Sequence, residues 1–228
     1  MPLKKNKKSP VEDARQHRYW DRRTGGRGPD HPVVRAFVRQ RLKALKPLIP
    51  FSEMRRLLDV GSGGGWALGP FKEEVPFVVG ADRSFELLSE SRERFPTLVR
   101  CDTYHLPFPD RSFDIVSCWE LLHHVSDIET AVREMVRVSR RYITLFEPNR
   151  YHPLQFLFGL AVAEERGTLR STLKLLTTLL RDAGTEIVHA GRVGVIFPNK
   201  LPAFLLPLCR RIPFRNPLGI SCMVVARK

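Results

Sequence analysis

The stretch Leu57–Pro70, LLDVGSGGGWALGP, decides the fold of this 228-residue chain. It runs a short apolar segment into Asp59 and then places four glycines within positions 61–65. Glycine costs conformational entropy on folding, so such a cluster indicates a backbone that bends sharply or is closely approached. A short apolar run closed by glycines is also typical of a buried strand that ends in a turn. We therefore expect a strand over residues 55–60 with a glycine-rich turn after it.

Similar short apolar runs recur along the chain after this stretch. Short apolar runs predict further strands at 77–82, 97–102, 113–119, 142–148, 185–197 and 220–227. Segments of helical spacing separate most of these runs. Strands that alternate with helices, and that are apolar almost throughout, predict an α/β fold whose parallel sheet is covered on both faces.

Helix signals mark where the intervening segments begin and end. Helical spacing starts at Pro32, and Ser84 is the expected N-cap of the helix after the second strand. Ser126 and Glu129 form a capping box ahead of the next helix. A later helical stripe, expected to stop at Gly184, consists of Leu169, Leu173, Leu176 and Leu180.

The net charge of +14 is concentrated at the two ends of the chain. Residues 1–46 carry +10 and residues 188–228 carry +7, whereas residues 47–187 carry −3. Basic ends indicate an anionic partner such as RNA, an anionic membrane surface or a phosphorylated substrate, although the first ten residues also suit a solubilising tail.

The cysteines and the hydropathy of the chain indicate its cellular location. The four cysteines form no CxxC pair and no zinc-type spacing, so we expect reduced thiols, a cytoplasmic location and no bound metal. The basic N-terminus lacks the apolar segment of a secretory signal, and no apolar run is long enough to span a bilayer.

The glycine spacing departs from two common nucleotide-binding motifs, the dinucleotide fingerprint and the P-loop. A dinucleotide fingerprint, G-x-G-x-x-G, would need glycine at position 66, where the chain has Trp66, and no Gly-Lys-Ser/Thr of a P-loop follows. The chain instead has G-x-G-x-G preceded by Asp59. Asp82 ends the second expected strand, 21 residues after Gly61, where an acidic side chain would meet ribose hydroxyls.

Five segments together resemble the successive motifs of class I S-adenosylmethionine-dependent methyltransferases, and most closely those of the quinone-biosynthesis group. They are LLDVGSGGG, VVGADRS, CDTYHLPFPDRSFDIV, ELLHHV and LFEPN, within about residues 55–150. The resemblance implies a doubly wound, mostly parallel seven-stranded sheet with helices on both faces and an antiparallel hairpin from the last two strands.

The resemblance also implies S-adenosyl-L-methionine as the cofactor and assigns roles to particular residues. The glycines would approach its methionine and ribose portion, Asp82 would hold the ribose hydroxyls, and Asp102 would accept from the adenine amino group. The complete implied set is Asp59, Gly61, Ser62, Gly63, Gly65, Asp82, Arg83, Asp102, Thr103 and Trp119.

Candidate catalytic residues follow the fourth expected strand. His124 could take a proton from an acceptor hydroxyl, and Glu120 could act as a base or bind a substrate amine. Because His123 and His124 are adjacent, we expect only one of them to face the site. The sulfonium of the cofactor is already activated, so amine or thiol acceptors need no base.

The domain organisation follows from these patterns. We expect a basic arm and lid helix over residues 1–46 and a methyltransferase domain over 47–228. The domain contains apolar insertions at 151–163 and 201–214 that would roof a pocket for a small or lipid-like acceptor. Two alternatives stay open: an RNA methyltransferase that uses the basic arm, and a non-catalytic scaffold that binds the cofactor.

Overall fold

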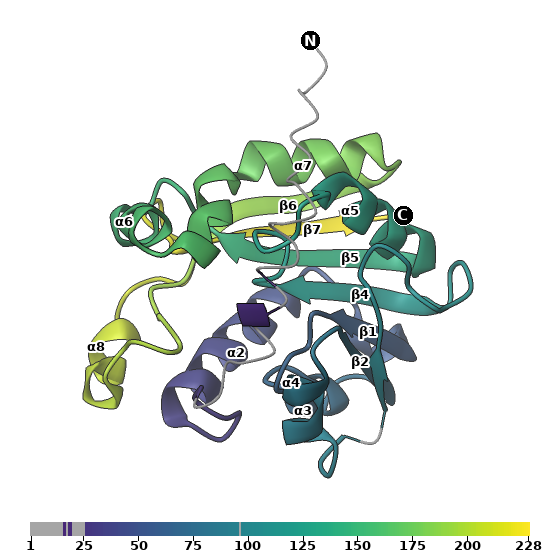
Figure 1. Ribbon diagram of the computed structural model, residues 1–228, viewed down its shortest axis with the longest axis horizontal. Helices are drawn as coiled ribbons and strands as arrows, with labels where there is room; N and C mark the ends of the chain where they lie inside the picture. The colour runs from purple at the N-terminus through teal and green to yellow at the C-terminus, as the bar shows by residue number, and fades with distance from the viewer. Residues whose placement is uncertain (1–15, 17, 20–25, 96) are drawn as a thin grey trace.

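A single mixed sheet forms the centre of the molecule. The computed structural model describes residues 16, 18, 19, 26–95 and 97–228, and these form a seven-stranded sheet of order β3-β2-β1-β4-β5-β7-β6 (Figure 1). Strands β1 to β5 are parallel, and β7 runs antiparallel to both β5 and β6. The strands are β1 (Arg56–Val60), β2 (Phe77–Asp82), β3 (Leu98–Arg100), β4 (Phe113–Trp119), β5 (Ser139–Pro148), β6 (Glu186–Val193) and β7 (Ser221–Arg227).

Helices connect the strands and cover the sheet. The α-helices of the described residues are α2 (Pro32–Leu45), α3 (Leu68–Lys72), α4 (Phe85–Ser91), α5 (Ile128–Val138), α6 (Pro153–Ala161), α7 (Leu173–Asp182) and α8 (Leu206–Cys209). Three short 3-10 helices are η1 (Phe51–Glu53), η2 (Ala163–Arg170) and η3 (Ala203–Leu205). The predicted α/β fold, with helices on both faces and an antiparallel hairpin at the end, is confirmed.

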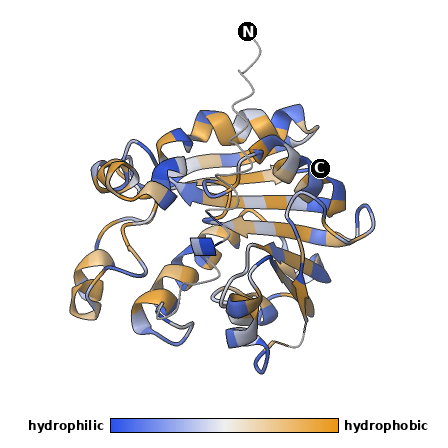
Figure 2. Cartoon of the chain, viewed as in Figure 1, coloured by the Kyte–Doolittle hydropathy of each residue, from blue (hydrophilic) through white to orange (hydrophobic). Residues whose placement is uncertain are grey.

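Alternation along β1 builds two cores, one on each face of the sheet. Leu57 packs in a cluster with apolar side chains of α2 and α3, while Leu58 packs in a second cluster with those of α5 and α7. This is the period-two arrangement of a strand buried on both faces. Figure 2 shows the hydrophobic colour continuing across the central strands.

Helix α2 belongs to the first of these cores. Val33, Val34 and Phe37 on this helix are buried against the sheet. Of the expected basic arm, residues 1–15, 17 and 20–25 lie outside the described residues. A lid function for residues 1–46 stays a prediction.

Two details of the helix ends differ from the sequence expectation. The N-cap of α5 is Asp127, whose carboxylate accepts from the Thr130 amide, whereas the Ser126 hydroxyl lies 2.9 Å from the Tyr104 hydroxyl. The N-cap is therefore one residue later than predicted, the predicted capping box does not form, and Ser126 contacts Tyr104 instead. Leu169 lies in η2 and not in the helix that carries Leu173.

The two apolar insertions fold into short helices. The segment 151–163 contains α6, and 201–214 contains η3 and α8. Both lie at the edge of the sheet where β5 ends, at the left of Figure 1. No helix of the described residues is long and apolar enough to cross a membrane.

Candidate functional site

The glycine-rich turn lies where the strand order of the sheet reverses. Strand β1 pairs with β2 on one side and with β4 on the other. Ligands of open α/β sheets bind at the carboxyl ends of strands on either side of such a point. The turn is tied to β2, because the amides of Gly61 and Ser62 both donate to the carbonyl of Ala81, at 2.7 and 3.1 Å.

The turn needs glycine for its backbone conformation and for a close contact. Gly61 has a φ of +76°, and a Cβ atom there would lie 2.9 Å from the side chain of Leu121. Gly63 also has a positive φ, of +49°. L-residues with side chains rarely adopt this region, so the sequence pattern reflects a conformational requirement.

Asp82, at the end of β2, holds the glycine turn in place. One of its carboxylate oxygens accepts from the Gly63 amide at 2.8 Å, and the other accepts from the Ser84 amide at 2.9 Å. Ser84 in turn caps α4 by accepting from Leu87, as predicted. The carboxylate therefore connects the turn after β1 with the helix after β2.

A cavity of about 170 Å³ opens beside Asp82. Predicted residues from three separate turns line it, namely Gly61, Gly63, Asp82, Arg83, Asp102 and Thr103. Arg83 pairs with Asp102 at 3.1 Å, although both side chains are substantially exposed. The buried Thr103 hydroxyl has no hydrogen-bond partner among the described residues, so a polar group remains available in this cavity.

Asp59 lies within a larger cavity on the other side of the turn. Its side chain is buried, and burial, reinforced by the nearby charge of Asp82, raises its pKa to about 8. A cation that approaches such a buried carboxyl favours its ionised form.

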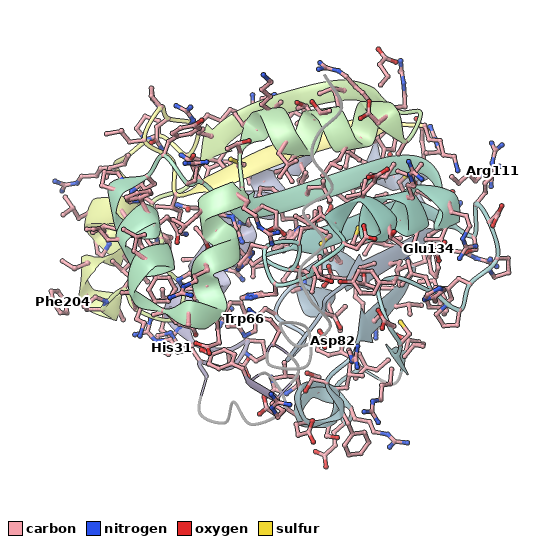
Figure 3. The ribbon with its side chains drawn as sticks, turned by 45° about the horizontal axis from the view of Figure 1, so that its top comes forward. His31, Trp66, Asp82, Arg111, Glu134 and Phe204 are labelled. Carbon is pink, nitrogen blue, oxygen red and sulfur yellow. The ribbon has the colours of Figure 1, made fainter. Side chains whose placement is uncertain are left out.

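The larger cavity measures about 1110 Å³ and combines segments that are distant in sequence. Gly61 and Gly63 of the turn line both cavities. Other walls come from residues 26–31, α2, α6 and residues 197–202. Trp66, whose surroundings the sequence did not predict, donates from its indole nitrogen to the carbonyl of Arg27 at 2.9 Å. Figure 3 shows Trp66 and His31, both of which line this cavity, close together on the same side of the molecule as Asp82.

A buried arginine contributes a charge to the larger cavity. Arg41 on α2 is only 2% exposed, forms an ion pair with Glu120 and donates to the Ser221 hydroxyl at 2.7 Å. Its guanidinium lies 3.6 Å from the centre of the Phe37 ring. Burial lowers the pKa of Arg41, and Glu120 opposes that effect. Glu120 has a φ of +57°, so a strained backbone presents its carboxylate to the arginine.

Trp119 closes this part of the cavity. It ends β4, lines the larger cavity, and packs edge-on against Phe71 and Phe146. Its indole N–H and the Nη1 of Arg41 are buried and have no hydrogen-bond partner among the described residues. Two donors therefore remain for an oxygen-bearing ligand.

His123 is held in a buried acidic network. Its Nδ1 lies 2.8 Å from Glu147, whose carboxylate also accepts from the amides of Leu121, Leu122 and His123. Its Nε2 lies 3.4 Å from Glu165 of η2. Burial alone would lower the pKa of His123, but Glu147 and then Glu165 outweigh it and raise the pKa to about 10.

The folded chain brings most of the predicted site residues together. Glu120 and His124 line both cavities, and Ser62 lines the larger one. Gly65 is the exception, because it lies behind the turn, where a Cβ atom would be 3.0 Å from the Ser91 hydroxyl. Gly64 lines the larger cavity in its place.

The prediction that only one of the two adjacent histidines faces the site is wrong. Both His123 and His124 line the larger cavity. They lie in a turn and not in a helix, and their rings are side by side, with centroids 3.8 Å apart.

Three charged residues of the site were not predicted from sequence. Arg41 falls on the buried stripe of α2, four residues after Phe37, and a charge on such a stripe was the available signal. Glu147 is likewise a charge inside an apolar strand. Glu165 gave no local signal, since only folding brings it to His123.

A strand-end carboxylate, a glycine turn at the reversal of strand order and two adjoining cavities define a nucleotide-type cofactor site. Comparison with known proteins makes the class specific. A family model described as a methyltransferase domain matches residues 58–142. The chain is 38% identical over 93 residues to the uncharacterized methyltransferase YcgJ of Bacillus subtilis, which covers 38% of this chain and 37% of that protein.

A second relative adds a named substrate. The chain is 30% identical over 100 residues to a demethylmenaquinone methyltransferase of Streptomyces griseus, which covers 43% of this chain and 44% of that protein. The matches thus span less than half the length of these relatives. A solved structure from Thermotoga maritima, described as a SAM-dependent methyltransferase and possible histamine N-methyltransferase, has a TM-score of 0.63 at 22% identity and covers 86% of this chain and 91% of that one. That likeness shows the shared fold.

Over residues 58–142 the chain is similar to S-adenosylmethionine-dependent methyltransferases, and S-adenosylmethionine is the cofactor that this similarity implies. The described residues fit that cofactor. The buried carboxyl of Asp59 suits a site that receives a cationic ligand, and the glycine turn leaves room for close approach. Thr103, whose buried hydroxyl has no partner among the described residues, lines the smaller cavity.

Proposed function

We propose that the protein transfers a methyl group from S-adenosylmethionine to a small or lipid-like acceptor that enters the larger cavity. The observation that carries this proposal is the continuity of that cavity. It extends from Asp59 and Ser62 at the cofactor turn to the apolar side chains of Phe37, Leu154 and Phe158. A largely apolar cavity with a few polar groups is typical of a small-molecule site.

The cofactor supplies an activated methyl group for in-line displacement when it is bound. Asp59 would face its cationic portion, Asp82 its ribose hydroxyls, and Asp102 with Thr103 its adenine. Asp82 has a second task, because it already fixes Gly63 and Ser84. The protein's main contribution to such a displacement is to hold the acceptor atom in line with the methyl group.

His124 and Glu120 are proposed to serve the acceptor in different ways. Both line the two cavities. Glu120 is engaged by Arg41 and Ser221, which favours a role in holding the arginine over a role as base. We assign to His124 the removal of a proton from a hydroxyl acceptor.

The demethylmenaquinone methyltransferase relative supports an apolar acceptor with an oxygen function. The unpartnered N–H groups of Arg41 and Trp119 offer two donors to such an oxygen at the wall of the larger cavity. Aromatic and aliphatic side chains around them would receive an apolar body.

An anionic membrane surface is the proposed source of a lipid-like acceptor. We call the exposed apolar residues of segments 151–161 and 201–218 the apolar rim. They are Tyr151, Leu154, Phe156, Leu157, Leu160, Phe204, Leu208, Ile212 and Leu218. Phe204 is 80% exposed and lies at the end of the molecule opposite Arg111 (Figure 3). Residues 188–228 contain seven Lys or Arg and no acid, which suits anionic headgroups.

The two alternatives are weaker. RNA methylation would depend on the basic arm, of which residues 1–15, 17 and 20–25 lie outside the described residues, and no described feature favours it. A non-catalytic scaffold finds no support among the methyltransferase relatives.

The test is transfer of a labelled methyl group from S-adenosylmethionine to three separate acceptors: a prenylated quinol in detergent, anionic phospholipid vesicles and bulk RNA. We expect label in the organic phase. Label in RNA alone would overturn the proposal. Leu154→Asp, at the cavity wall, should abolish transfer and spare cofactor binding. The matched control Phe77→Asp changes a similarly exposed apolar residue at the start of β2 and should leave transfer intact.

A further inference from the structure

Three buried side chains with metal-ligating atoms lie together at the wall of the larger cavity. His123, His124 and Glu165 each offer one ligand atom, and these atoms all lie within 4.8 Å of one another. The three residues line the larger cavity, so the cluster is reached from it. We propose that they bind a divalent transition-metal cation of the zinc type.

The ligand types and spacing suit that cation. Zinc binds two histidines and one glutamate in known catalytic sites, with a fourth position left open. Bonds of about 2.0–2.1 Å in tetrahedral geometry place ligand atoms about 3.3–3.5 Å apart. The 3.4 Å between His123 Nε2 and Glu165 Oε2 matches this separation. The rings of His123 and His124 are adjacent, with centroids 3.8 Å apart.

Glu147 supplies the support that such a ligand requires. A metal-bound histidine usually donates its other ring N–H to a carboxylate, which fixes the tautomer and the orientation of the ring. Glu147 is positioned to accept from His123 Nδ1 at 2.8 Å, and three backbone amides hold that carboxylate in place. His123 is thereby left with Nε2 facing Glu165.

Charge balance favours a divalent cation. Glu147 and Glu165 are both buried, and a buried carboxylate is costly without compensation. A divalent cation held by Glu165 and by His123, whose Nδ1 lies 2.8 Å from Glu147, would compensate both carboxylates.

The chain also fixes the position of Glu165. Segment η2 lies directly against the backbone of His123, since a Cβ atom at Gly167 would be 1.6 Å from the His123 carbonyl oxygen. Only glycine permits this approach, which brings Glu165 to the cluster from 42 residues further along the chain. Sequence spacing predicted no metal, because no local motif unites these ligands.

The open position would face the acceptor. This part of the inference depends on the proposed function: the cation would bind the acceptor oxygen and, as a Lewis acid, lower the pKa of an acceptor hydroxyl. With the cation bound, His124 is a ligand, so this activation takes the place of proton removal by His124. The substrate class is accordingly a hydroxyl compound such as a phenol, an enol or a quinol.

Metal binding can be measured without any acceptor. The chelator-treated full-length protein is titrated calorimetrically with Zn²⁺, and with Mg²⁺ as a hard-cation control, at mildly alkaline pH. Metal content is then measured after gel filtration. We expect one Zn²⁺ per chain and no comparable Mg²⁺ binding. Glu165→Gln and His124→Asn, each checked for folding by circular dichroism, should weaken Zn²⁺ binding at least tenfold. The matched control Glu164→Gln, one residue away, should retain it.

The outcomes separate this site from the proposed function. Absence of stoichiometric Zn²⁺ from the folded protein, or equal binding by Glu165→Gln and His124→Asn, would overturn the metal site. S-adenosylhomocysteine is titrated into the same metal-free sample. If S-adenosylhomocysteine binds but zinc does not, the metal site is wrong and the proposed function is still supported. Zinc binding that is lost in the two variants, without any cofactor binding, would support the site and count against the proposed function.

Discussion

We call the parts of the site proposed to bind the cofactor and the acceptor the cofactor end and the acceptor end, and they are built from contacts of very different range. At the cofactor end, the key hydrogen bond joins Gly63 to Asp82, 19 residues apart. At the acceptor end, Arg27 donates to the carbonyls of Pro198 and Leu201, 171 and 174 residues away, and Arg41 reaches Ser221 across 180 residues. The first end follows from adjacent strand–turn units, while the second exists only when the whole chain has folded.

This difference has an energetic consequence. Substitutions at the cofactor end should act through local backbone strain and carboxylate chemistry, whereas those at the acceptor end should act through buried charge and long-range packing. Four substitutions separate these two kinds of effect.

Glu120→Gln should have the largest effect on stability. It leaves the nearly inaccessible Arg41 guanidinium without its anionic partner, and breaking a buried pair in this way costs about 3–5 kcal/mol. Urea unfolding measures the loss. The control Glu129→Gln breaks an exposed pair with Arg133 and should cost about 0.5 kcal/mol or less. Adding Arg41→Met to Glu120→Gln should recover stability, and an additive double variant would contradict the buried-pair account.

Gly61→Ala should destabilise the fold by about 2–4 kcal/mol. The cost of a left-handed backbone conformation adds to the cost of a steric clash between the new Cβ atom and Leu121. The matched control is Gly184→Ala. Gly184 has a similar φ of +85° but open space around its Cβ position, so its cost should be about 1–2 kcal/mol. Equal losses in thermal or urea unfolding would show that the contact with Leu121 is unimportant.

Asp59 should give the cofactor-free protein a characteristic pH dependence. Its pKa is raised to about 8 in the folded state from 3.8, so the folded chain retains a proton that the unfolded chain releases. Stability from this group is therefore complete at acid pH and is lost as the pH rises toward 8. Between pH 5 and 7 the unfolding free energy should fall by about 1.4 kcal/mol per pH unit relative to Asp59→Asn. Parallel pH profiles for the two proteins would contradict the raised pKa.

Trp66→Phe should have the smallest effect. The ring is kept but the hydrogen bond to the Arg27 carbonyl is lost, at a cost of about 1 kcal/mol. Because that bond joins Trp66 to residues 26–31 in the wall of the larger cavity, we expect a raised KM for the acceptor with cofactor affinity unchanged. A selective loss of cofactor affinity would move Trp66 to the cofactor end.

The range of the contacts also explains what the sequence could predict. The turn at Gly61, the carboxylate at Asp82 and the final hairpin were predictable, because each depends on a short pattern and its neighbouring strand. The capping of α5 by Asp127 was not, since the Tyr104 hydroxyl engages Ser126 from 22 residues away.

The acceptor end shows more clearly what could not be predicted from the sequence. Arg41 and Glu147 break apolar patterns, which is a signal that they are special but not of what they contact. Glu165 breaks no pattern, and its approach to His123 depends on the close packing at Gly167. The residues that we propose to select the acceptor are therefore the ones that the sequence alone predicts least well.

The most direct test of the central claim is calorimetric titration of the protein with S-adenosylmethionine and S-adenosylhomocysteine. Asp82→Asn is titrated in parallel, with Asp182→Asn, an exposed aspartate at the end of α7, as the matched control. We predict saturable one-to-one binding by the wild-type protein and the control. Affinity should fall at least tenfold in Asp82→Asn, because a charged hydrogen-bond acceptor is lost. Absence of binding by the folded wild-type protein would contradict the account.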